Sequence, residues 1–197
     1  MKPVFLFDFD GTITKKELLP LVAMKTNLEV EISRLTQDTI QGKIPFEESF
    51  LKRVKLLEKI PLQTIQNIFV EAPVNIELLS WIKAHRELCF VVTGQLDIWI
   101  KPWLDKHELI GFSSEASVSL EGIKVNKIID KITVASNFED REIVFIGDGA
   151  NDASLMEKAN IGIGTEIVHK VPEMIWEVAD LVVWEEEALC RILSRLL

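Results

Sequence analysis

Short apolar runs alternate with longer segments of helical periodicity along the chain, and this alternation predicts an α/β fold. The runs carry almost no polar residues, as expected of strands in a parallel sheet that helices cover on both faces. The predicted buried strands are residues 4–7, 88–92, 143–146, 161–163 and 181–183. Three of them end in Asp, Thr-Gly or Gly-Asp. In open α/β sheets ligands bind beyond the carboxyl ends of the strands, so functional side chains are expected at these endings.

Residues 14–74 carry no convincing strand pattern and are predicted to be helical. Two apolar stripes at helical spacing are followed by a segment that Pro61 opens and that runs to residue 69, and Gly42 is a stop signal after the first stripe. An ordinary crossover between parallel strands needs one helix, so several helices predict a cap inserted above the site. The expected architecture is a Rossmann-like, doubly wound parallel sheet core of residues 1–13 and 75–197 with a helical cap domain of residues 14–74. The stripes are Leu28, Ile32, Leu35 and Ile40, then Phe46, Phe50, Val54 and Leu57.

Two local features interrupt this pattern. Pro102 lies inside the otherwise helical segment 96–107. It is expected to kink or split that helix, because proline lacks a backbone donor and clashes with the preceding turn. Residues 117–125, with Glu121-Gly122 in the middle, are predicted to form a small hairpin.

Charge and composition narrow the classes of function. The 197 residues are 48% hydrophobic and 27% charged, which is typical of a globular protein. Acidic residues outnumber basic ones by 31 to 22, and the net charge of −9 disfavours a nucleic-acid partner. The N-terminal apolar run is too short for a signal peptide, and no later run approaches a membrane span. A cytoplasmic protein without a membrane partner is therefore expected, and its oligomeric state is left open.

The cysteines and histidines indicate no site of their own. Cys89 lies inside an apolar run and Cys190 in an amphipathic stretch, so both are interpreted as core residues. His85, His107 and His169 are scattered along the chain and are interpreted as surface or helix-end residues.

Two acidic motifs follow predicted strands and are the strongest indication of chemistry. Residues 8–14 read Asp-Phe-Asp-Gly-Thr-Ile-Thr, and residues 147–152 read Gly-Asp-Gly-Ala-Asn-Asp. Either motif alone could be ordinary loop or helix-cap chemistry, where aspartate is common. Together at strand ends, the carboxylates would repel one another unless a cation neutralised them, and hard oxygen ligands of this kind suit Mg²⁺.

These motifs, with Val-Val-Thr-Gly at residues 91–94, resemble the haloacid dehalogenase superfamily of phosphohydrolases, and within it the phosphoserine phosphatase-like branch with a helical cap. The resemblance spans essentially the whole chain. It implies that Asp8 is the nucleophile, that Asp10 is the general acid/base and that Thr93 binds phosphate through its hydroxyl. Asp148 and Asp152 match the last of the family's four motifs.

The lysine of the third motif is assigned by spacing. Lys127 fits the family's spacing to Asp148 best, and Lys131, one turn later, is the main rival. The resemblance implies that this lysine stabilises the oxygens of the transferring phosphoryl group.

The mechanism implied by the resemblance is a magnesium-dependent phosphatase reaction through an aspartyl-phosphate on Asp8. Asp10 would protonate the leaving oxygen and then accept a proton from the hydrolytic water. Mg²⁺ is expected to be held by Asp8, the backbone carbonyl of Asp10 and Asp148, with Asp152 ordering a bound water.

The same resemblance indicates that the partner is a small phosphorylated metabolite, most closely phosphoserine. Glu17 matches a glutamate that contacts the amino-acid portion of the substrate in that branch. Phe46 matches a phenylalanine that closes over the site, and Arg53 an arginine that binds the substrate carboxylate. Gly94 and Asn151 are assigned to the same substrate site.

One departure leaves the substrate open. Gln95 follows Thr93-Gly94 where phosphoserine phosphatases have a second glycine, so a bulky polar side chain replaces bare backbone at the substrate pocket. Alternatives are a phosphatase of another small metabolite, such as a methionine-salvage phosphate ester, and a phosphotransferase of the same branch. A non-catalytic ligand- or protein-binding module is the alternative from another class, which the retained catalytic residue types disfavour. A dehalogenase is also disfavoured, because that chemistry dispenses with the role assigned to Asp10.

Overall fold

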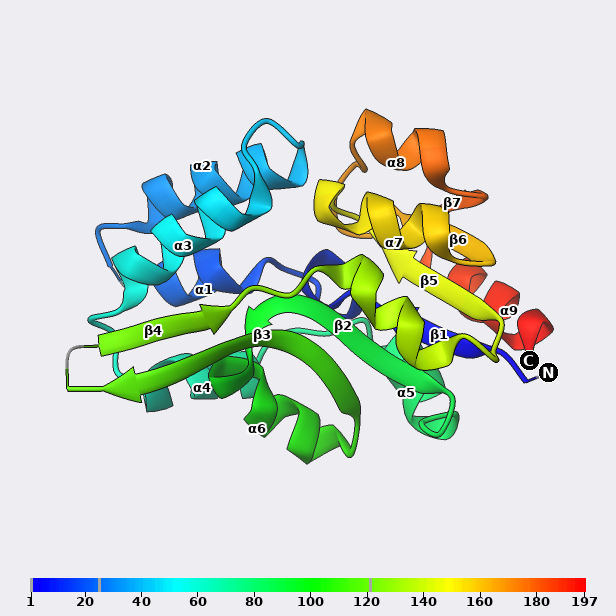
Figure 1. Ribbon diagram of the computed structural model, residues 1–197, viewed down its shortest axis with the longest axis horizontal. Coiled ribbons are helices and arrows are strands. Elements are labelled where there is room, and N and C mark those ends of the chain that lie inside the picture. Colours follow the sequence, from blue (N-terminus) through cyan, green and yellow to red (C-terminus); the bar gives the residue numbers. More distant parts are fainter. Residues whose placement is uncertain (1, 25, 121) are drawn as a thin grey trace.

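The computed structural model describes residues 2–24, 26–120 and 122–197 and contains a seven-stranded sheet in the order β4-β3-β2-β1-β5-β6-β7 (Figure 1). All neighbouring strands run parallel except β4, which pairs with β3 as an antiparallel hairpin. The sheet confirms the predicted fold class and the predicted strands. The strands are β1 (Val4–Phe7), β2 (Cys89–Leu96), β3 (Ile110–Ser119), β4 (Gly122–Lys127), β5 (Ile143–Gly147), β6 (Ile161–Thr165) and β7 (Leu181–Val183).

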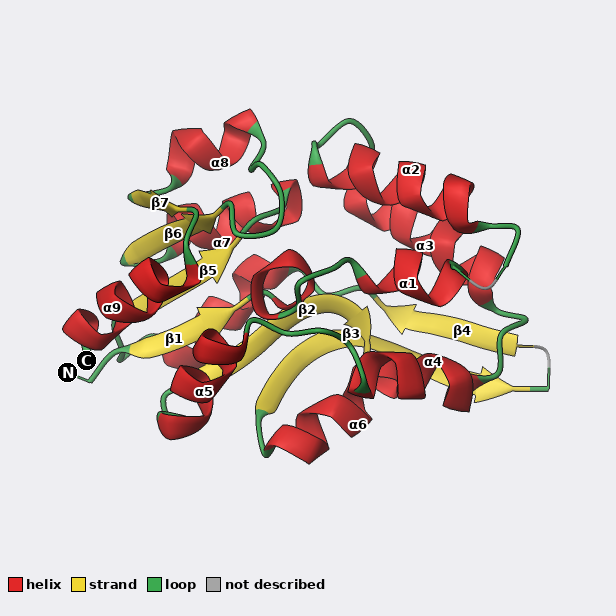
Figure 2. Ribbon diagram, turned by 180° about the vertical axis from the view of Figure 1, so that it is seen from behind, coloured by secondary structure: helices red, strands yellow, loops and turns green. Residues whose placement is uncertain are grey.

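The central strand β1 shows why the sheet needs covering on both faces. Phe5 and Phe7 belong to one buried apolar cluster, whereas Val4 and Leu6 belong to another. Successive side chains of a strand point to opposite faces, so the two clusters are the two sides of the sheet. Helices α5 (Ile76–Ala84), α6 (Asp97–His107) and α9 (Glu186–Leu196) contribute to the first cluster, and α7 (Ala153–Lys158) and α8 (Glu173–Val178) to the second. Figure 2 shows the helical layers on either side of the sheet.

The predicted helical stretch folds into α1 (Leu18–Ala23), α2 (Glu29–Ile40), α3 (Phe46–Leu57) and α4 (Leu62–Val70). Each predicted stripe forms one helix, and Gly42, at a φ of 69°, follows the end of α2 as predicted. The two ends of the stretch lie side by side through an isolated bridge between Thr14 and Val74. Helix α4 packs against α6 and α1 (Figure 1). The division into a core of residues 1–13 and 75–197 and a cap of residues 14–74 therefore stays a prediction.

Pro102 does not split its helix into two pieces, which was one of the two outcomes expected from the sequence. Helix α6 continues from Asp97 to His107 with Pro102 inside it. A proline at this position cannot donate to the carbonyl of Ile98, four residues earlier. The side-chain amide of Gln66 on α4 donates to that carbonyl instead, at 2.8 Å. A tertiary contact thus satisfies the acceptor that the proline leaves without a helical partner.

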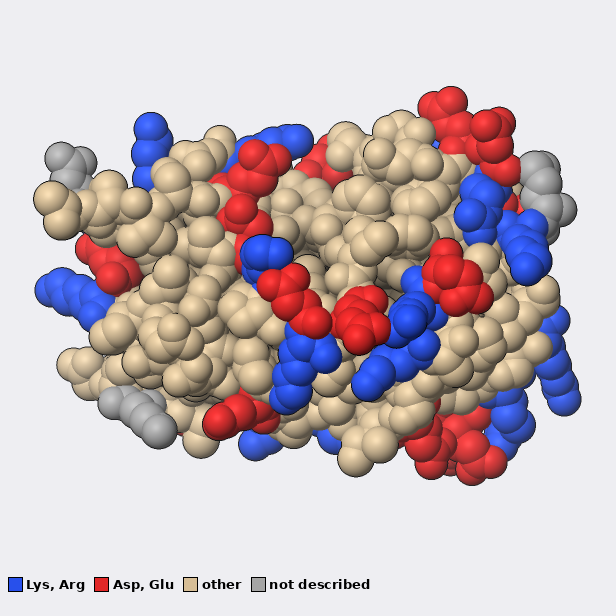
Figure 3. All heavy atoms as spheres, turned by 90° about the horizontal axis from the view of Figure 1, so that it is seen from below, with Lys and Arg blue, Asp and Glu red and all other residues tan. Residues whose placement is uncertain are grey.

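The predicted hairpin of residues 117–125 is present, with Ser119 paired to Gly122. Glu121, in its predicted turn, lies outside the described residues. On the face in Figure 3, acidic and basic side chains are interspersed and form no continuous basic patch among the residues drawn in colour. Within the described ranges, none of the helices has the length and apolar character needed to cross a bilayer.

Candidate active site

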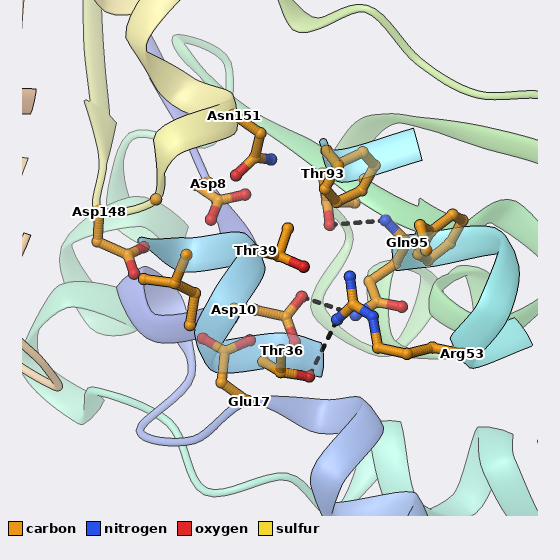
Figure 4. Close-up of a pocket in the computed structure, with 15 residues that line it drawn as sticks. Asp8, Asp10, Glu17, Thr36, Thr39, Arg53, Thr93, Gln95, Asp148 and Asn151 are labelled. Carbon is orange, nitrogen blue, oxygen red and sulfur yellow. Dashed lines mark hydrogen bonds between the residues drawn. The ribbon is translucent and has the colours of Figure 1, made fainter. Parts of the chain in front are cut away.

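The predicted site residues converge at the carboxyl ends of three adjacent strands. Asp8 follows β1, Asp148 follows β5, and Thr93 lies within β2, on the other side of β1. The chain leaves β1 for β2 and β3 on one side and later returns for β5 and β6 on the other, so β1 is where the strand order reverses. Ligands of open α/β sheets bind at such a switch point. Figure 4 shows Asp8, Asp10, Asp148 and Thr93 facing one common space.

Lys131 binds one carboxylate from each of the two acidic motifs. Its ammonium lies 2.5 Å from Asp8 Oδ1 and 2.5 Å from Asp152 Oδ1, and its side chain is 2% exposed. The second oxygen of Asp152 accepts the backbone N–H groups of Asp148 and Gly149, at 3.0 Å each. Asp152 therefore joins Lys131 to the loop after β5.

Lys127 is not at the site, and the assignment made by spacing is corrected in favour of its rival. Lys127 is the last residue of β4, its side chain is 70% exposed, and its nearest acidic partner is Glu115 at 3.9 Å. Lys131 begins a 3₁₀ helix (Lys131–Phe138) that returns the chain to the strand ends. The three residues between β4 and this helix place the two lysines in different environments.

The electrostatics of the Asp8–Lys131–Asp152 group follow from its burial. Burial alone would lower the pKa of Lys131, but Asp152 and Asp8 raise it above its ordinary value, so the lysine is a permanent cation. Burial and then Asp152 raise the pKa of Asp8 well above its ordinary value, against the opposing effect of Lys131. One lysine does not offset the negative charge of this centre, and an ionised Asp8 needs a further positive charge.

The turn after β1 requires glycine at residue 11. Gly11 has a φ of 72°, and a Cβ there would lie 2.5 Å from Asp148 Oδ2 and 2.9 Å from His169 Nε2. The turn also brings the hydroxyl of Thr12 to Asp148 Oδ1, to which it donates at 2.8 Å. Thr12 lies within the first motif, but sequence reasoning gave it no role. The structure shows that it orients the carboxylate of the second motif.

Asp10 is held by two donors. The backbone N–H of Leu18 donates to Oδ1 at 2.9 Å, and the side-chain amide of Gln95 donates to Oδ2 at 3.0 Å. Burial and the neighbouring Glu17 raise the pKa of Asp10 to about 7, although both hydrogen bonds act in the opposite direction. A carboxyl with this pKa can give and take a proton near neutral pH, as a general acid/base must.

His169 lies at the site, and its interpretation as a surface or helix-end residue was wrong. Its Nε2 lies 2.7 Å from Asp148 Oδ2 and 3.3 Å from Glu17 Oε1. Burial would lower the pKa of this imidazole, but hydrogen bonds to Asp148 and Glu17 raise it to about 11. The sequence around His169 contains no recognisable motif. Its position at the site depends on the path of the loop after β6, which the sequence does not show.

The donor set fits a divalent metal ion. Asp8, Asp148 and Asp152 each offer an oxygen, and these atoms lie within 4.8 Å of one another. Glu17, Asp148 and His169 form a second, overlapping group with the same property. Burial raises the pKa of Asp148 as well as that of Asp8, so a bound divalent cation would favour the ionised form of both. Carboxylate oxygens are the ligands that hard cations prefer.

A cavity of about 50 Å³ extends from these carboxylates towards the helices α2 and α3. Four carboxylates line it against one guanidinium, that of Arg53. The structure places every residue predicted for the substrate site in this wall, and adds Thr36, Thr39 and Gln95. The predicted residues are Glu17, Phe46, Arg53, Gly94 and Asn151.

Arg53 and Phe46 reach the cavity from α3. Arg53 is 5% exposed, donates from Nη1 to the Thr36 hydroxyl at 3.0 Å and lies over the ring of Phe50. Burial lowers the pKa of its guanidinium, but Glu17 and Asp10 act in the opposite direction. The ring of Phe46 covers Gly94 so closely that a Cβ at residue 94 would overlap it. Gly94 therefore allows α3 to approach β2.

A family model of haloacid dehalogenase-like hydrolases matches residues 2–160. The chain belongs to this family. Among curated relatives of this hydrolase, the phosphoserine phosphatase of Methanocaldococcus jannaschii is 28% identical over 209 aligned residues, which cover 98% of this chain and 97% of the relative. The phosphoserine phosphatase of Lactococcus lactis is 26% identical over 178 residues, with 82% of each chain covered.

Solved structures agree with this membership. A phospho-aspartyl intermediate analogue of phosphoserine phosphatase matches the hydrolase with a TM-score of 0.80 and 25% identity, over 98% of both chains. A substrate-bound phosphoserine phosphatase complex has the same fold, with a TM-score of 0.81 and 24% identity over 99% of this chain and 98% of that one. The predicted resemblance, fold class and activity class, a phosphoric monoester hydrolase, are confirmed.

Proposed function

We propose that the protein hydrolyses a small phosphomonoester carrying an amino acid moiety, most closely phosphoserine, through an aspartyl-phosphate on Asp8. One observation supports this most strongly: Asp8 and Asp10 line the same cavity, Asp8 bound to Lys131 and Asp10 with a pKa raised to about 7. This arrangement supplies a nucleophile beside a positive charge and a proton donor for the leaving group.

The reaction divides into two displacements. A carboxylate oxygen of Asp8 attacks phosphorus while the ester oxygen leaves and takes the proton of Asp10. Asp10, now ionised, accepts a proton from the water that attacks the acyl phosphate, and inorganic phosphate leaves with Asp8 regenerated. Lys131 and the Thr93 hydroxyl are proposed to stabilise the phosphoryl oxygens. Asp8, the Asp10 carbonyl, Asp148 and Asp152 are proposed to form a Mg²⁺ site, whose ion would offset repulsion between nucleophile and phosphate.

The cavity wall supports a zwitterionic ester as the substrate. The Arg53 guanidinium is preorganised by Thr36 and suits a carboxylate. Glu17 carries the opposite charge and suits an ammonium group. Both charged groups lie in the same wall as Asp8, so one small molecule can reach all three.

The test measures hydrolysis and the intermediate together. With Mg²⁺, the wild-type protein is expected to release phosphate from phosphoserine, and Asp8→Asn to lose turnover and the hydroxylamine-sensitive phosphoryl mass on the intact protein. Asp105→Asn, an exposed residue on α6 paired with Lys101, is the matched control and should retain both. Full turnover by Asp8→Asn, after deamidation is excluded by mass, would refute the nucleophile.

A panel of phosphorylated metabolites decides between esters. Arg53→Ala is expected to raise KM mainly for esters that carry a carboxylate. If the wild-type protein prefers an uncharged sugar-like ester, or if Arg53→Ala affects all esters equally, the phosphoserine-like assignment is wrong. The activity class would stand in either case.

A further inference from the structure

Gln95 lines the substrate cavity and has a buried acceptor without a partner among the described residues. The residue is 6% exposed, and its Oε1 atom has no hydrogen-bond partner among the described residues. Leaving such an atom unpaired is unfavourable, so its retention calls for a ligand or an ordered water. Of the side chains with a buried unpaired polar atom, Gln95 is the one that lines the cavity between Asp10 and Arg53 (Figure 4).

The amide nitrogen of Gln95 fixes the orientation of its side-chain amide group. Gln95 Nε2 donates to Asp10 Oδ2 at 3.0 Å, and the backbone N–H of Gln95 donates to Thr93 Oγ1 at 3.1 Å. Reversing the amide would set its oxygen against a carboxylate oxygen, which is unfavourable when Asp10 is ionised. The contact with Asp10 therefore directs Oε1 away from Asp10.

The charges around Oε1 favour a cationic donor. Asp10 and Glu17 lie in the same wall, and their carboxylates raise the local negative potential. The one cation of the wall, Arg53, directs Nη1 to Thr36 and Nε to the Ser49 carbonyl, with no hydrogen bond to Gln95 among the described contacts. An ammonium group between Glu17 and Gln95 would satisfy the free acceptor and the charge together.

We propose that Gln95 both positions Asp10 through its amide nitrogen and selects an amino-bearing ester through its amide oxygen. The selection of the ammonium group rests on the proposed function, because it assumes an amino acid ester in this cavity. The positioning of Asp10 does not. Phosphoserine phosphatases have glycine where this chain has Gln95. The glutamine would then link recognition of the amino group to placement of the general acid/base.

Two esters that differ in one group isolate the recognition half. O-Phosphoserine carries the ammonium group, and 3-phosphooxypropanoate has hydrogen in its place with the carboxylate retained. In Gln95→Met, which preserves length without polar atoms, the preference for phosphoserine in kcat/KM is expected to fall about tenfold, since a site that pairs a substrate N–H discriminates strongly against its absence. Gln63→Met, an exposed residue on α4, is the matched control and should keep the wild-type preference.

A second variant separates positioning from recognition. Gln95→Glu keeps an oxygen towards the cavity but cannot donate to Asp10. It should retain the preference for phosphoserine while kcat falls for both esters, with KM for phosphoserine little changed. Thermal unfolding of each variant confirms that the fold is intact, and the contrast between Met and Glu does not arise from packing alone.

The outcomes distinguish the inference from the function on which it rests. If the wild-type protein prefers phosphoserine and Gln95→Met keeps that preference in full, recognition by Gln95 is overturned and the proposed function stands. If the wild-type protein hydrolyses aryl phosphates but neither ester, the phosphoserine-like function and the ammonium subsite both fail. If kcat is unchanged in Gln95→Glu, the positioning half is overturned.

Discussion

Lys131 is the residue on which the charge balance of the site depends. Lys131→Met would leave Asp8 and Asp152 buried without their cation, so we expect phosphatase activity to fall by about 100-fold or more. The free energy of unfolding should also fall, by about 3–5 kcal/mol, because breaking a buried ion pair strands the remaining charge. Steady-state kinetics with an aryl phosphate and urea denaturation measure the two effects.

Lys127→Met is the matched control for this prediction. Its side chain is exposed on β4 and makes one long contact with Glu115, so activity and stability should stay near wild type. The reverse pattern, with Lys127→Met inactive and Lys131→Met active, would restore the assignment made from spacing.

Asp10 sets the expected pH dependence of the first chemical step. Its pKa of about 7 lies above its ordinary value, so the carboxyl is protonated at lower pH and loses its proton as the pH rises through 7. For an alkyl phosphate, whose leaving oxygen needs that proton, kcat/KM should fall about tenfold per pH unit above this point. An aryl phosphate with a good leaving group should show a shallower decline. Profiles that fall in parallel for both esters would contradict the role of Asp10 as general acid.

Residues that follow buried strands were the predictable part of the site. Asp8, Asp148 and Thr93 are placed by the strands before them, and a strand of apolar residues can be recognised without a structure. Lys131 and His169 lie in segments whose path depends on tertiary contacts. Three residues separate Lys127 from Lys131, yet the first lysine is exposed at the end of a strand and the second lies buried at the centre of the site. The spacing of the two lysines in the sequence does not predict this change in the path of the chain.

At the scale of elements, the contact between α4 and α6 compensates for Pro102. Gln66→Ala would leave the Ile98 carbonyl without its donor, and we expect the free energy of unfolding to fall by about 1 kcal/mol with little effect on kcat. Denaturant unfolding measures the change. Gln63→Ala is the control, because its amide bonds only to Asn67 on the exposed side of the same helix.

A double-mutant cycle tests the cause. In Pro102→Ala, residue 102 regains a backbone N–H that can donate to the Ile98 carbonyl. Gln66→Ala should therefore lower the free energy of unfolding by less in this background than in the wild-type protein. Equal costs in both backgrounds would mean that Gln66 stabilises the helix pair in another way. The sequence alone indicated a kinked or split helix, because Gln66 lies 32 positions away from the carbonyl that it satisfies.

At the scale of the whole molecule, the fold class followed from the alternation of strands and helices, whereas the placement of α4 did not. The apolar stripes predicted which residues of α2 and α3 are buried. A stripe does not indicate which other element its helix packs against. Helix α4 uses its stripe against α6, while α2 and α3 face the cavity with Thr36, Thr39 and Arg53. These last two helices therefore form the wall of the cavity on that side.

The small volume of the cavity leads us to expect that α2 and α3 move when substrate enters. Its volume of about 50 Å³ is well below the roughly 300–1,000 Å³ of small-molecule sites. Closure rests on few contacts: Phe46 covers Gly94, and Gly42 lies near Met174 and Ala150. Backbone amides of α2 and α3 should therefore exchange hydrogen faster than those of β1 and β5, whose strands are buried on both faces.

A phosphoryl mimic should slow that exchange. Beryllium fluoride with Mg²⁺ binds an aspartate carboxylate in place of phosphate, so we expect it to protect α2 and α3 several-fold and to leave β1 and β5 unchanged, as measured by hydrogen exchange and mass spectrometry. Asp8→Asn removes the carboxylate that the mimic needs and should abolish the protection. Equal protection in this variant, or protection spread evenly over the sheet, would show that closure of α2 and α3 is not tied to the phosphoryl group on Asp8.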